Sequence, residues 1–263
     1  MKQIILLIGG LRFILSLSKD PRVDDEIRPF VIDTDEMDNR SSFRTEVIVT
    51  YEADTSVQNW KITVSEDAHQ VSVHYAPDTA YRFTALRGCI IYIPMEDILL
   101  LHQRFFLHAS FITSPWGGLL FTGNSGVGKS TQAELWKEHM GSTVINGDRT
   151  IIAKEKNGWR AYGSPYAGSS RYFVQQDEPI RAIVLLEQAD ENRMEAVSAS
   201  EAFAKLFLQV SLDHEDADLV NRLCDLLSEL VAEIPIYRLY CTPDQRAVET
   251  LKTVLEDEDA LSL

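Results

Sequence analysis

The sequence predicts an α/β domain over residues 96–263, preceded by a small β-rich domain over residues 1–95. Three observations support this prediction. A glycine-rich loop lies between a short apolar run and a helical segment, as in phosphate-binding domains. Short alternating runs separated by polar turns fill much of the first third of the chain. Apolar residues at helical spacing dominate the last third.

Composition limits the kinds of partner. The chain has 263 residues, 45% of them hydrophobic, and a formal net charge of −15. This charge argues against a nucleic-acid partner and against a polybasic membrane contact, because both require surfaces rich in Lys and Arg. Nowhere does the sequence approach the roughly 18 apolar residues of a membrane span. Three widely spaced cysteines indicate neither a disulfide framework nor a metal cluster, so a cytoplasmic location is expected.

The β-rich domain is expected to carry no catalytic cluster. Residues 1–20 are interpreted as an edge strand or a loosely attached leader, and residues 20–44 mostly as loop. Alternating Val, Ile, Thr and aromatic residues then predict a meander of four strands and a fifth, more apolar strand. The four are Glu46–Tyr51, Trp60–Val64, Gln70–Tyr75 and Tyr81–Leu86, and the fifth is Cys89–Ile93.

The second domain is organised around a phosphate-binding loop. Its residues are Gly123, Asn124, Ser125, Gly126, Val127, Gly128, Lys129 and Ser130, followed by Thr131. They match the pattern G-x-x-x-x-G-K-[ST] between a predicted strand, Leu119–Phe121, and a predicted helix, Ser130–Met140, with Gly141 as its cap. Backbone amides and the positive end of the helix would hold phosphate. Lys129 would reach the β- and γ-phosphates and Ser130 would bind Mg²⁺, which predicts nucleoside triphosphate binding.

Two ionisable residues are expected beside this loop. After a helix over Glu96–Arg104, the run Phe106–Ile112 should form a hairpin with Leu119–Phe121, which places His108 next to the phosphate loop. Thr143–Arg149 is a short strand that contains Asp148, a candidate Mg²⁺ ligand or catalytic base. Alternatively, Asp148 could cap a turn and have no chemical role. Glu187, at the end of the apolar strand Ile183–Glu187, is a second candidate for the Mg²⁺ ligand or catalytic base.

The remaining segments cover or border the site. The loop Ala161–Arg171, rich in Gly, Ser and Tyr, is suited to binding a second substrate, and Arg171 is a candidate transition-state cation or an ordinary surface residue. Periodicity predicts three helices and a strand that complete the domain. They are the helices Ser200–Leu208 and Asp216–Ala232, the strand Tyr237–Cys241 and a last helix from Pro243, with a frayed acidic tail at Glu256–Asp259.

The order of these motifs resembles one known family. His108-Ala109-Ser110, the loop with Thr131, Ile145–Arg149 and Gly163-Ser164-Pro165 follow one another as in HPr kinase-like proteins. Those are the catalytic domains of HPr serine kinase/phosphorylase, related in fold to the ATP-using phosphoenolpyruvate carboxykinases. The resemblance spans about residues 105–190 and implies an ATP- and Mg²⁺-dependent serine kinase. In such a kinase Asp148 would take the proton of the attacking hydroxyl, and His108 would lie near that acid and the phosphates.

The chain also departs from this family. It has Gly147-Asp148 where HPr kinases have two adjacent acids, and it lacks their Glu-Ile-Arg-Gly segment, so HPr and phosphorolysis are not expected. It looks more like the diverged kinases found beside peptide-modification genes, including those that phosphorylate the terminal serine of lasso-peptide precursors. The β-rich domain would then hold the acceptor. HPr kinases are hexamers, which hints at a homo-oligomer.

Three functions therefore remain open from the sequence. The first is a kinase for a Ser/Thr hydroxyl of a peptide or small protein. The second is a kinase for a small hydroxylated metabolite such as free serine, which would need the same base, Asp148. The third is a nucleotide-gated regulatory module without phosphotransfer, for which Lys129 would matter and Asp148 would not.

Overall fold

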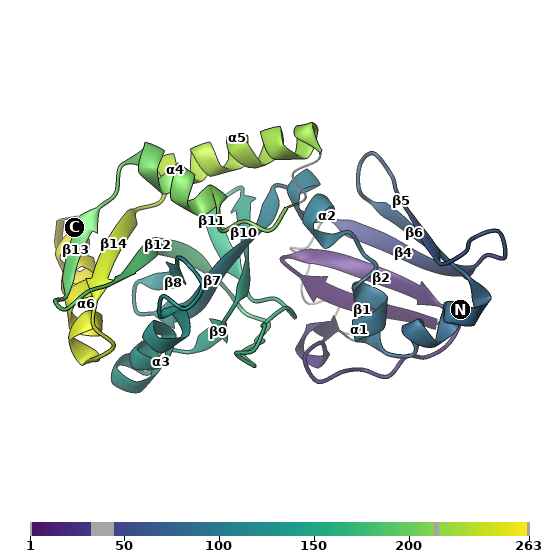
Figure 1. Ribbon diagram of the computed structural model, residues 1–263, viewed down its shortest axis with the longest axis horizontal. Coiled ribbons are helices and arrows are strands. Elements are labelled where there is room, and N and C mark those ends of the chain that lie inside the picture. The colour runs from purple at the N-terminus through teal and green to yellow at the C-terminus, as the bar shows by residue number, and fades with distance from the viewer. Residues whose placement is uncertain (1, 33–44, 213–215, 262–263) are drawn as a thin grey trace. The chain divides into compact units, whose positions relative to one another are not determined.

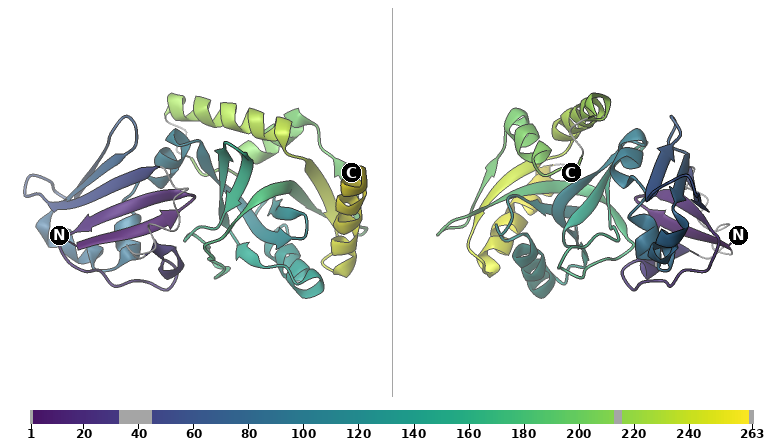
Figure 2. Two further views of the ribbon diagram at one scale, coloured as in Figure 1. Left: turned by 180° about the vertical axis from the view of Figure 1, so that it is seen from behind. Right: turned by 45° about the vertical axis from the view of Figure 1, so that its right-hand side comes forward.

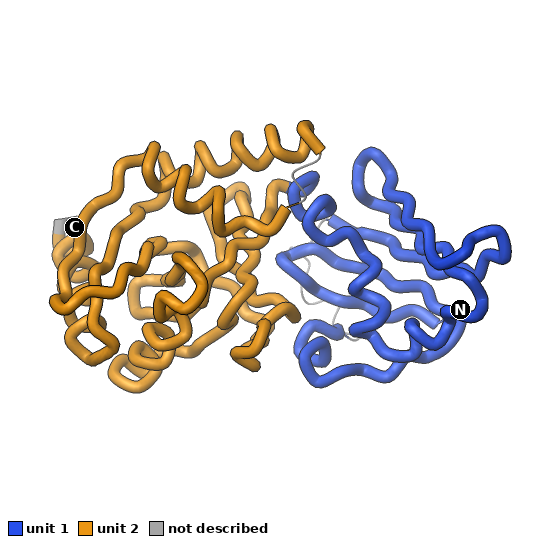
Figure 3. The backbone as a smooth tube through the Cα atoms, in the orientation of Figure 1, with its two compact units in different colours: residues 1–102 blue, residues 103–263 orange. Residues whose placement is uncertain are grey.

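The computed structural model describes residues 2–32, 45–212 and 216–261. The chain divides into two compact units, residues 1–102 and residues 103–263 (Figure 3). Helix α2, Met95–Leu101, therefore belongs to the first unit, whereas the sequence analysis assigned it to the second domain. Part of the loop expected over residues 20–44 lies outside the described residues. The preceding part contains a 3₁₀ helix, Arg28–Phe30.

Among the described residues of the first unit, six strands form one sheet in the order β3-β1-β2-β4-β6-β5. The bounds are Lys2–Ile8 (β1), Leu11–Leu17 (β2), Val31–Ile32 (β3), Glu46–Ala53 (β4), Trp60–Val64 (β5) and Gln70–Tyr75 (β6). The three strands predicted between residues 46 and 75 are confirmed, but the meander is wrong. Strands β4 and β6 are parallel neighbours, and β5 pairs with the outer side of β6.

The expected edge strand or loosely attached segment is not observed, because residues 2–17 lie within the sheet. Strands β1 and β2 make an antiparallel hairpin in the interior of the sheet, flanked by β3 and β4. Gly9 and Gly10, with φ of 58° and 75°, form the two-residue turn. Positive φ at both central positions suits the right-handed twist of a hairpin, and only glycine adopts it freely. The Gly-Gly pair between two apolar runs was thus a hairpin signal that the sequence analysis passed over.

The predicted strands Tyr81–Leu86 and Cys89–Ile93 are wrong, because the chain is helical there. A 3₁₀ helix, Pro77–Phe83, is followed by helix α1, Leu86–Ile90. The buried residues of this segment recur three or four positions apart, which is a helical spacing. The hydroxyl of Tyr51 on β4 donates a hydrogen bond to the Cys89 carbonyl at 3.0 Å, which attaches α1 to the sheet.

Among the described residues of the second unit, eight strands form a larger sheet, in the order β11-β10-β7-β8-β12-β14-β13 with β9 paired to β7. The bounds are Arg104–Ser114 (β7), Gly117–Thr122 (β8), Val144–Asn146 (β9), Arg149–Glu155 (β10), Gly158–Tyr162 (β11), Asp177–Gln188 (β12), Arg193–Ala196 (β13) and Ile236–Cys241 (β14). The predicted β7–β8 hairpin is confirmed. Strands β8, β12 and β14 are parallel neighbours, so their C-terminal ends lie at one edge of the sheet.

Helices lie on both sides of these strands (Figures 1 and 2). Helices α3, Lys129–Met140, and α6, Gln245–Leu261, bury Trp136 and Leu251 in a core shared with β8 and β14. Helices α4, Ala199–Phe207, and α5, Ala217–Glu233, lie on the other side. None of the helices in the described part of the chain is long and apolar enough to cross a bilayer.

The acidic tail is not frayed, contrary to the prediction. Residues Glu256–Asp259 lie within α6. The Glu258 carboxylate accepts a hydrogen bond from Arg181 at 3.0 Å and another from the hydroxyl of Tyr237. These contacts hold the last turns of the helix against the sheet.

Candidate functional site

The phosphate-binding loop has a backbone that requires its glycines. Gly123, Gly126 and Gly128 have φ of 141°, 77° and 114°, which residues with a side chain rarely adopt. A Cβ at position 126 or 128 would meet no atom within 4 Å, so the space above the loop is open. Gly128 directly precedes α3, whose first-turn amides have no partner within the helix. The loop therefore has the shape and the donors to hold a phosphate group.

Lys129 lies across this loop. Its ammonium group donates hydrogen bonds to the carbonyl oxygens of Gly123 at 2.9 Å and Asn124 at 3.2 Å. Burial lowers the pKa of the Lys129 ammonium, while the negative charge of Asp148 acts in the opposite direction. A cation held at the loop and within reach of a carboxylate is suited to bind the terminal phosphates of a nucleotide.

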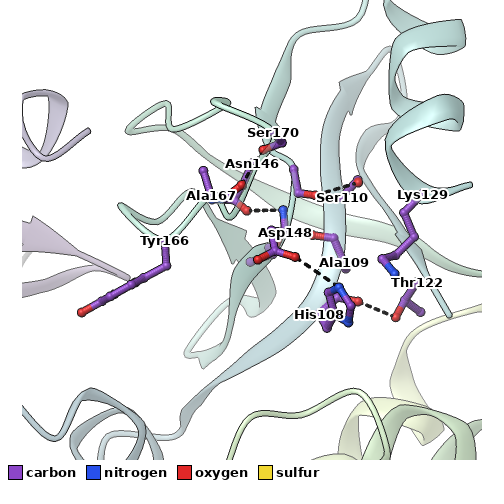
Figure 4. A network of polar contacts seen from close by, with 12 residues as sticks. His108, Ala109, Ser110, Thr122, Lys129, Asn146, Asp148, Tyr166, Ala167 and Ser170 are labelled. Carbon is purple, nitrogen blue, oxygen red and sulfur yellow. Dashed lines mark hydrogen bonds and ion pairs between the residues drawn. The ribbon is translucent and has the colours of Figure 1, made fainter. Parts of the chain in front are cut away.

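His108 and Asp148 form a pair beside the loop (Figure 4). The Nε2 atom of His108 lies 3.1 Å from Oδ1 of Asp148, and each side chain is about one-third exposed, 35% and 32% respectively. The backbone sets this distance. His108 on β7 is opposite Arg149 on β10, and the amide of Ala109 donates to the Asp148 carbonyl at 2.9 Å. Because a carboxylate only accepts, the Nε2–H of neutral His108 is the donor.

The surroundings keep His108 neutral. Burial lowers the pKa of the imidazole, and the charges of Lys129 and Arg149 lower it further. The carboxylate of Asp148 raises this pKa, but by less than the other causes lower it. At neutral pH the neutral imidazole therefore orients the Asp148 side chain through a hydrogen bond.

A buried side chain that sequence reasoning missed holds Asp148 in place. The Oδ1 atom of Asn146 accepts a hydrogen bond from the Asp148 amide at 2.9 Å, and Nδ2 donates to the Ser164 carbonyl at 3.0 Å. Asn146 is completely buried at the end of β9. A polar residue that ends the apolar run Val144–Ile145 was the signal for this role, because a buried amide needs partners.

The loop after β11 packs closely on Asp148. A Cβ at Gly168 would lie only 2.5 Å from Oδ2 of Asp148. A Cβ at Gly147 would lie 2.2 Å from Oγ of Ser170. With the loop in this position, residue 147 cannot be an acid. The glycine at position 147 therefore makes room for the loop.

The structure brings some predicted residues together and leaves others apart. His108, Lys129 and Asp148 interact electrostatically. Arg171 is exposed in the loop after β11, with φ of 58°, and has no recorded contact with these three among the described residues. Glu187 forms an ion pair with Arg238 at 2.9 Å. Ser130 and Thr131 are exposed in the first turn of α3.

Metal binding would depend on more than this chain. The described residues contain no group of three or more His, Cys, Asp or Glu side chains that could hold a metal ion. The Ser130 hydroxyl and the Asp148 carboxylate are both oxygen ligands of the kind that Mg²⁺ prefers. Because Mg²⁺ is commonly held by one or two carboxylates plus substrate phosphates, such a sparse protein contribution fits this ion.

A cavity opens at the His108–Asp148 pair. Its volume is about 270 Å³, and it is also lined by Arg149 and by the segment Leu208–Ser211 after α4. The amide of His108 donates to the Gln209 carbonyl at 2.8 Å, so this segment lies directly against β7. Leu208 is 76% exposed, although it is a large apolar residue. The cavity can hold a hydroxyl group close to the Asp148 carboxylate.

Comparisons with known proteins add one likeness in structure. No family model matches the chain, and no curated protein matches it. Among solved structures, the chain is similar to the Hpr(Ser) kinase/phosphatase from Coxiella burnetii, with 14% sequence identity and a TM-score of 0.35. The match covers 60% of this chain and 96% of the other. At this TM-score the likeness carries no conclusion about the activity of this chain.

Proposed function

We propose that this protein is an ATP- and Mg²⁺-dependent kinase that phosphorylates a Ser/Thr hydroxyl of a peptide or small protein. One observation carries the proposal. The His108–Asp148 pair lies beside the phosphate-binding loop, and the Lys129 charge acts on both of its members. A phosphate site, a cation and an oriented carboxylate are the parts that phosphoryl transfer to a hydroxyl requires.

Each residue has a defined task in this reaction. The loop amides and Lys129 hold the β- and γ-phosphates, and the Lys129 ammonium has to leave the carbonyls of Gly123 and Asn124 to do so. Bound Mg²⁺ would neutralise phosphate charge, with Ser130 and Asp148 as its protein ligands. The acceptor oxygen bonds to the γ-phosphorus as the bond to the β–γ bridging oxygen breaks. Asp148 accepts the hydroxyl proton, and neutral His108 keeps the carboxylate oriented.

The acceptor site favours a chain end or a flexible peptide. The cavity at Asp148 is open to solvent, and exposed Leu208 in its lining offers an apolar contact to a neighbouring acceptor residue. A terminal serine, as in lasso-peptide precursors, could reach the carboxylate without unfolding a larger partner. The net charge of −15 is compatible with an acceptor that carries some positive charge.

A second candidate is a kinase for a small hydroxylated metabolite such as free serine. The observation that favours it is the size of the acceptor cavity, about 270 Å³, which is small for a peptide but sufficient for a single amino acid. Both candidates need Asp148 as the base. A regulatory module without phosphotransfer would need Lys129 alone.

Transfer of label from γ-labelled ATP with Mg²⁺ tests the proposal. The acceptors are a precursor-type peptide with a terminal serine, HPr and free serine. We expect label on the peptide, lost in both Lys129→Ala and Asp148→Asn. Exposed Lys156→Ala and Asp225→Asn are the matched controls and should keep it. Label on free serine alone would favour the metabolite kinase, and nucleotide binding that is unaffected by Asp148→Asn with no labelled acceptor would contradict the kinase proposal.

A further inference from the structure

The sheet order determines on which side of the loop a nucleotide base has to lie. The P-loop strand β8 has β7, which carries His108, on one side and β12, followed by β14, on the other. If phosphoryl transfer occurs beside His108 and Asp148, the terminal phosphate lies on the β7 side. The phosphate chain then extends away from β7, and the ribose and base lie toward the C-terminal ends of β12 and β14. Ligands of parallel α/β sheets bind beyond these ends.

A cavity occupies this place. It has a volume of about 560 Å³ and begins at the phosphate loop, where Gly126 to Gly128 and Thr131 form one wall. The opposite wall consists of the residues that follow β12 and β14, among them Ala189 and Pro243. This volume lies within the usual range of small-ligand sites, about 300–1,000 Å³. It is separate from the cavity at Asp148, which has a different lining.

Gln132, which lines this cavity, has an unused hydrogen-bonding group. Gln132 is only 2% exposed, and its Oε1 atom is buried without a hydrogen-bond partner among the described residues. Cys241 also lines this cavity. A buried acceptor without a partner is rare and unfavourable, so it suggests a ligand that supplies a donor.

We infer that this cavity binds the base of the nucleotide and that Gln132 recognises the 6-amino group of adenine. The inference rests on the proposed function, because it requires a nucleotide on the phosphate loop. The terminal torsion of a glutamine side chain is broad, so the side-chain amide of Gln132 can turn its oxygen toward a ligand in the cavity. The 6-amino group then donates to Oε1, while Val127 and Pro243 supply apolar contacts to the ring.

This arrangement selects ATP over GTP. Guanine carries an oxygen at the 6 position, and two acceptors facing each other leave both without a donor. A 6-deamino purine has neither group, so it loses the hydrogen bond without adding a repulsion. The expected order of affinity is therefore ATP first, the 6-deamino nucleotide second and GTP last.

Binding measurements on the full chain with Mg²⁺ test the inference without relying on turnover. The ligands are non-hydrolysable analogues of ATP, GTP and 6-deamino ATP, together with inorganic tripolyphosphate. The proteins are the wild type, Gln132→Leu and Gln70→Leu, a control at an exposed position of β6. Tripolyphosphate reports on the loop alone, so its unchanged affinity for Gln132→Leu shows that the variant is folded.

In the wild type and in Gln70→Leu, loss of the 6-amino group should weaken binding about tenfold. In Gln132→Leu the affinities for the ATP analogue and the 6-deamino analogue should differ by no more than about twofold, because the partner of the amino group is gone. The inference is overturned if removal of the 6-amino group weakens binding equally in the wild type and in Gln132→Leu. It is also overturned if the ATP analogue binds no tighter than tripolyphosphate. In either case tripolyphosphate binding would still support the loop as a phosphate site. If neither tripolyphosphate nor any nucleotide binds, the proposed function fails as well.

Discussion

The Nε2 atom of His108 lies 3.1 Å from Oδ1 of Asp148, although forty residues separate the two in the sequence. The antiparallel pairing of β7 with β10 creates this contact, and it occurs next to the proposed phosphate-binding loop. The pair therefore combines an oriented carboxylate with a nearby cation, Lys129. The following predictions test what each part of this arrangement contributes.

Replacing His108 should slow catalysis and leave nucleotide binding intact. In His108→Ala the Asp148 carboxylate loses its orienting donor, so kcat should fall about 10- to 100-fold, less than for a missing base. The affinity for an ATP analogue should change little, because His108 makes no contact with the loop amides. Steady-state kinetics and a binding titration measure the two effects. His139→Ala, an exposed histidine on α3, is the control, and an equal loss of kcat in both variants would contradict the assignment.

The lowered pKa of His108 predicts how stability depends on pH. The folded protein holds this pKa below the unfolded value of 6.5, so the unfolded state binds more protons in the interval between the two. Stability should therefore fall as the pH drops from about 6.5 through the folded pKa. His108→Gln should lose less stability than the wild type over the same interval. Denaturant unfolding at a series of pH values measures this, and parallel curves for the two proteins would contradict the prediction.

Removing the Asn146 side chain should cost both stability and activity. Asn146→Ala leaves the half-buried Asp148 amide without its acceptor, which costs about 1–3 kcal/mol in the free energy of unfolding. The displaced Asp148 should also lower kcat. Asn157→Ala, in the exposed turn between β10 and β11, should do neither. Denaturant unfolding and label transfer provide the two readouts, and a stable Asn146→Ala with full activity would show that Asp148 needs no such support.

Adding a methyl group at Gly168 should displace the Asp148 carboxylate. The Cβ would lie 2.5 Å from Oδ2 of Asp148, and φ is 54°. Gly141→Ala is a matched control, because its φ is 68° and its Cβ would meet no atom within 4 Å. Both variants should lose about 1 kcal/mol of stability from the unfavourable φ. Only Gly168→Ala should also lose activity, by at least about tenfold for a misplaced reacting group. Equal activity of the two variants would argue against the close contact.

Local sequence patterns determined the glycine-rich loop and the elements on either side of it. The spacing of Gly123, Gly128 and Lys129, the apolar strand before them and the glycine cap at Gly141 each depend on neighbouring residues in the chain. The β7–β8 hairpin follows from a short turn in the same way. These elements could be predicted because backbone geometry, turn chemistry and helical periodicity act over a few residues.

Tertiary structure decided the rest, because it depends on contacts between distant segments. The apolar run Cys89–Ile93 suits a strand or a helix equally well, and packing against Tyr51 selects the helix. Strand pairing placed β4 beside β6, which no local pattern encodes. In the site, the sequence identified His108 and Asp148 as candidates. Their distance, the support from Asn146 and the close approach of Gly168 arose only when strands from separate parts of the chain met, since burial and register are properties of the whole sheet.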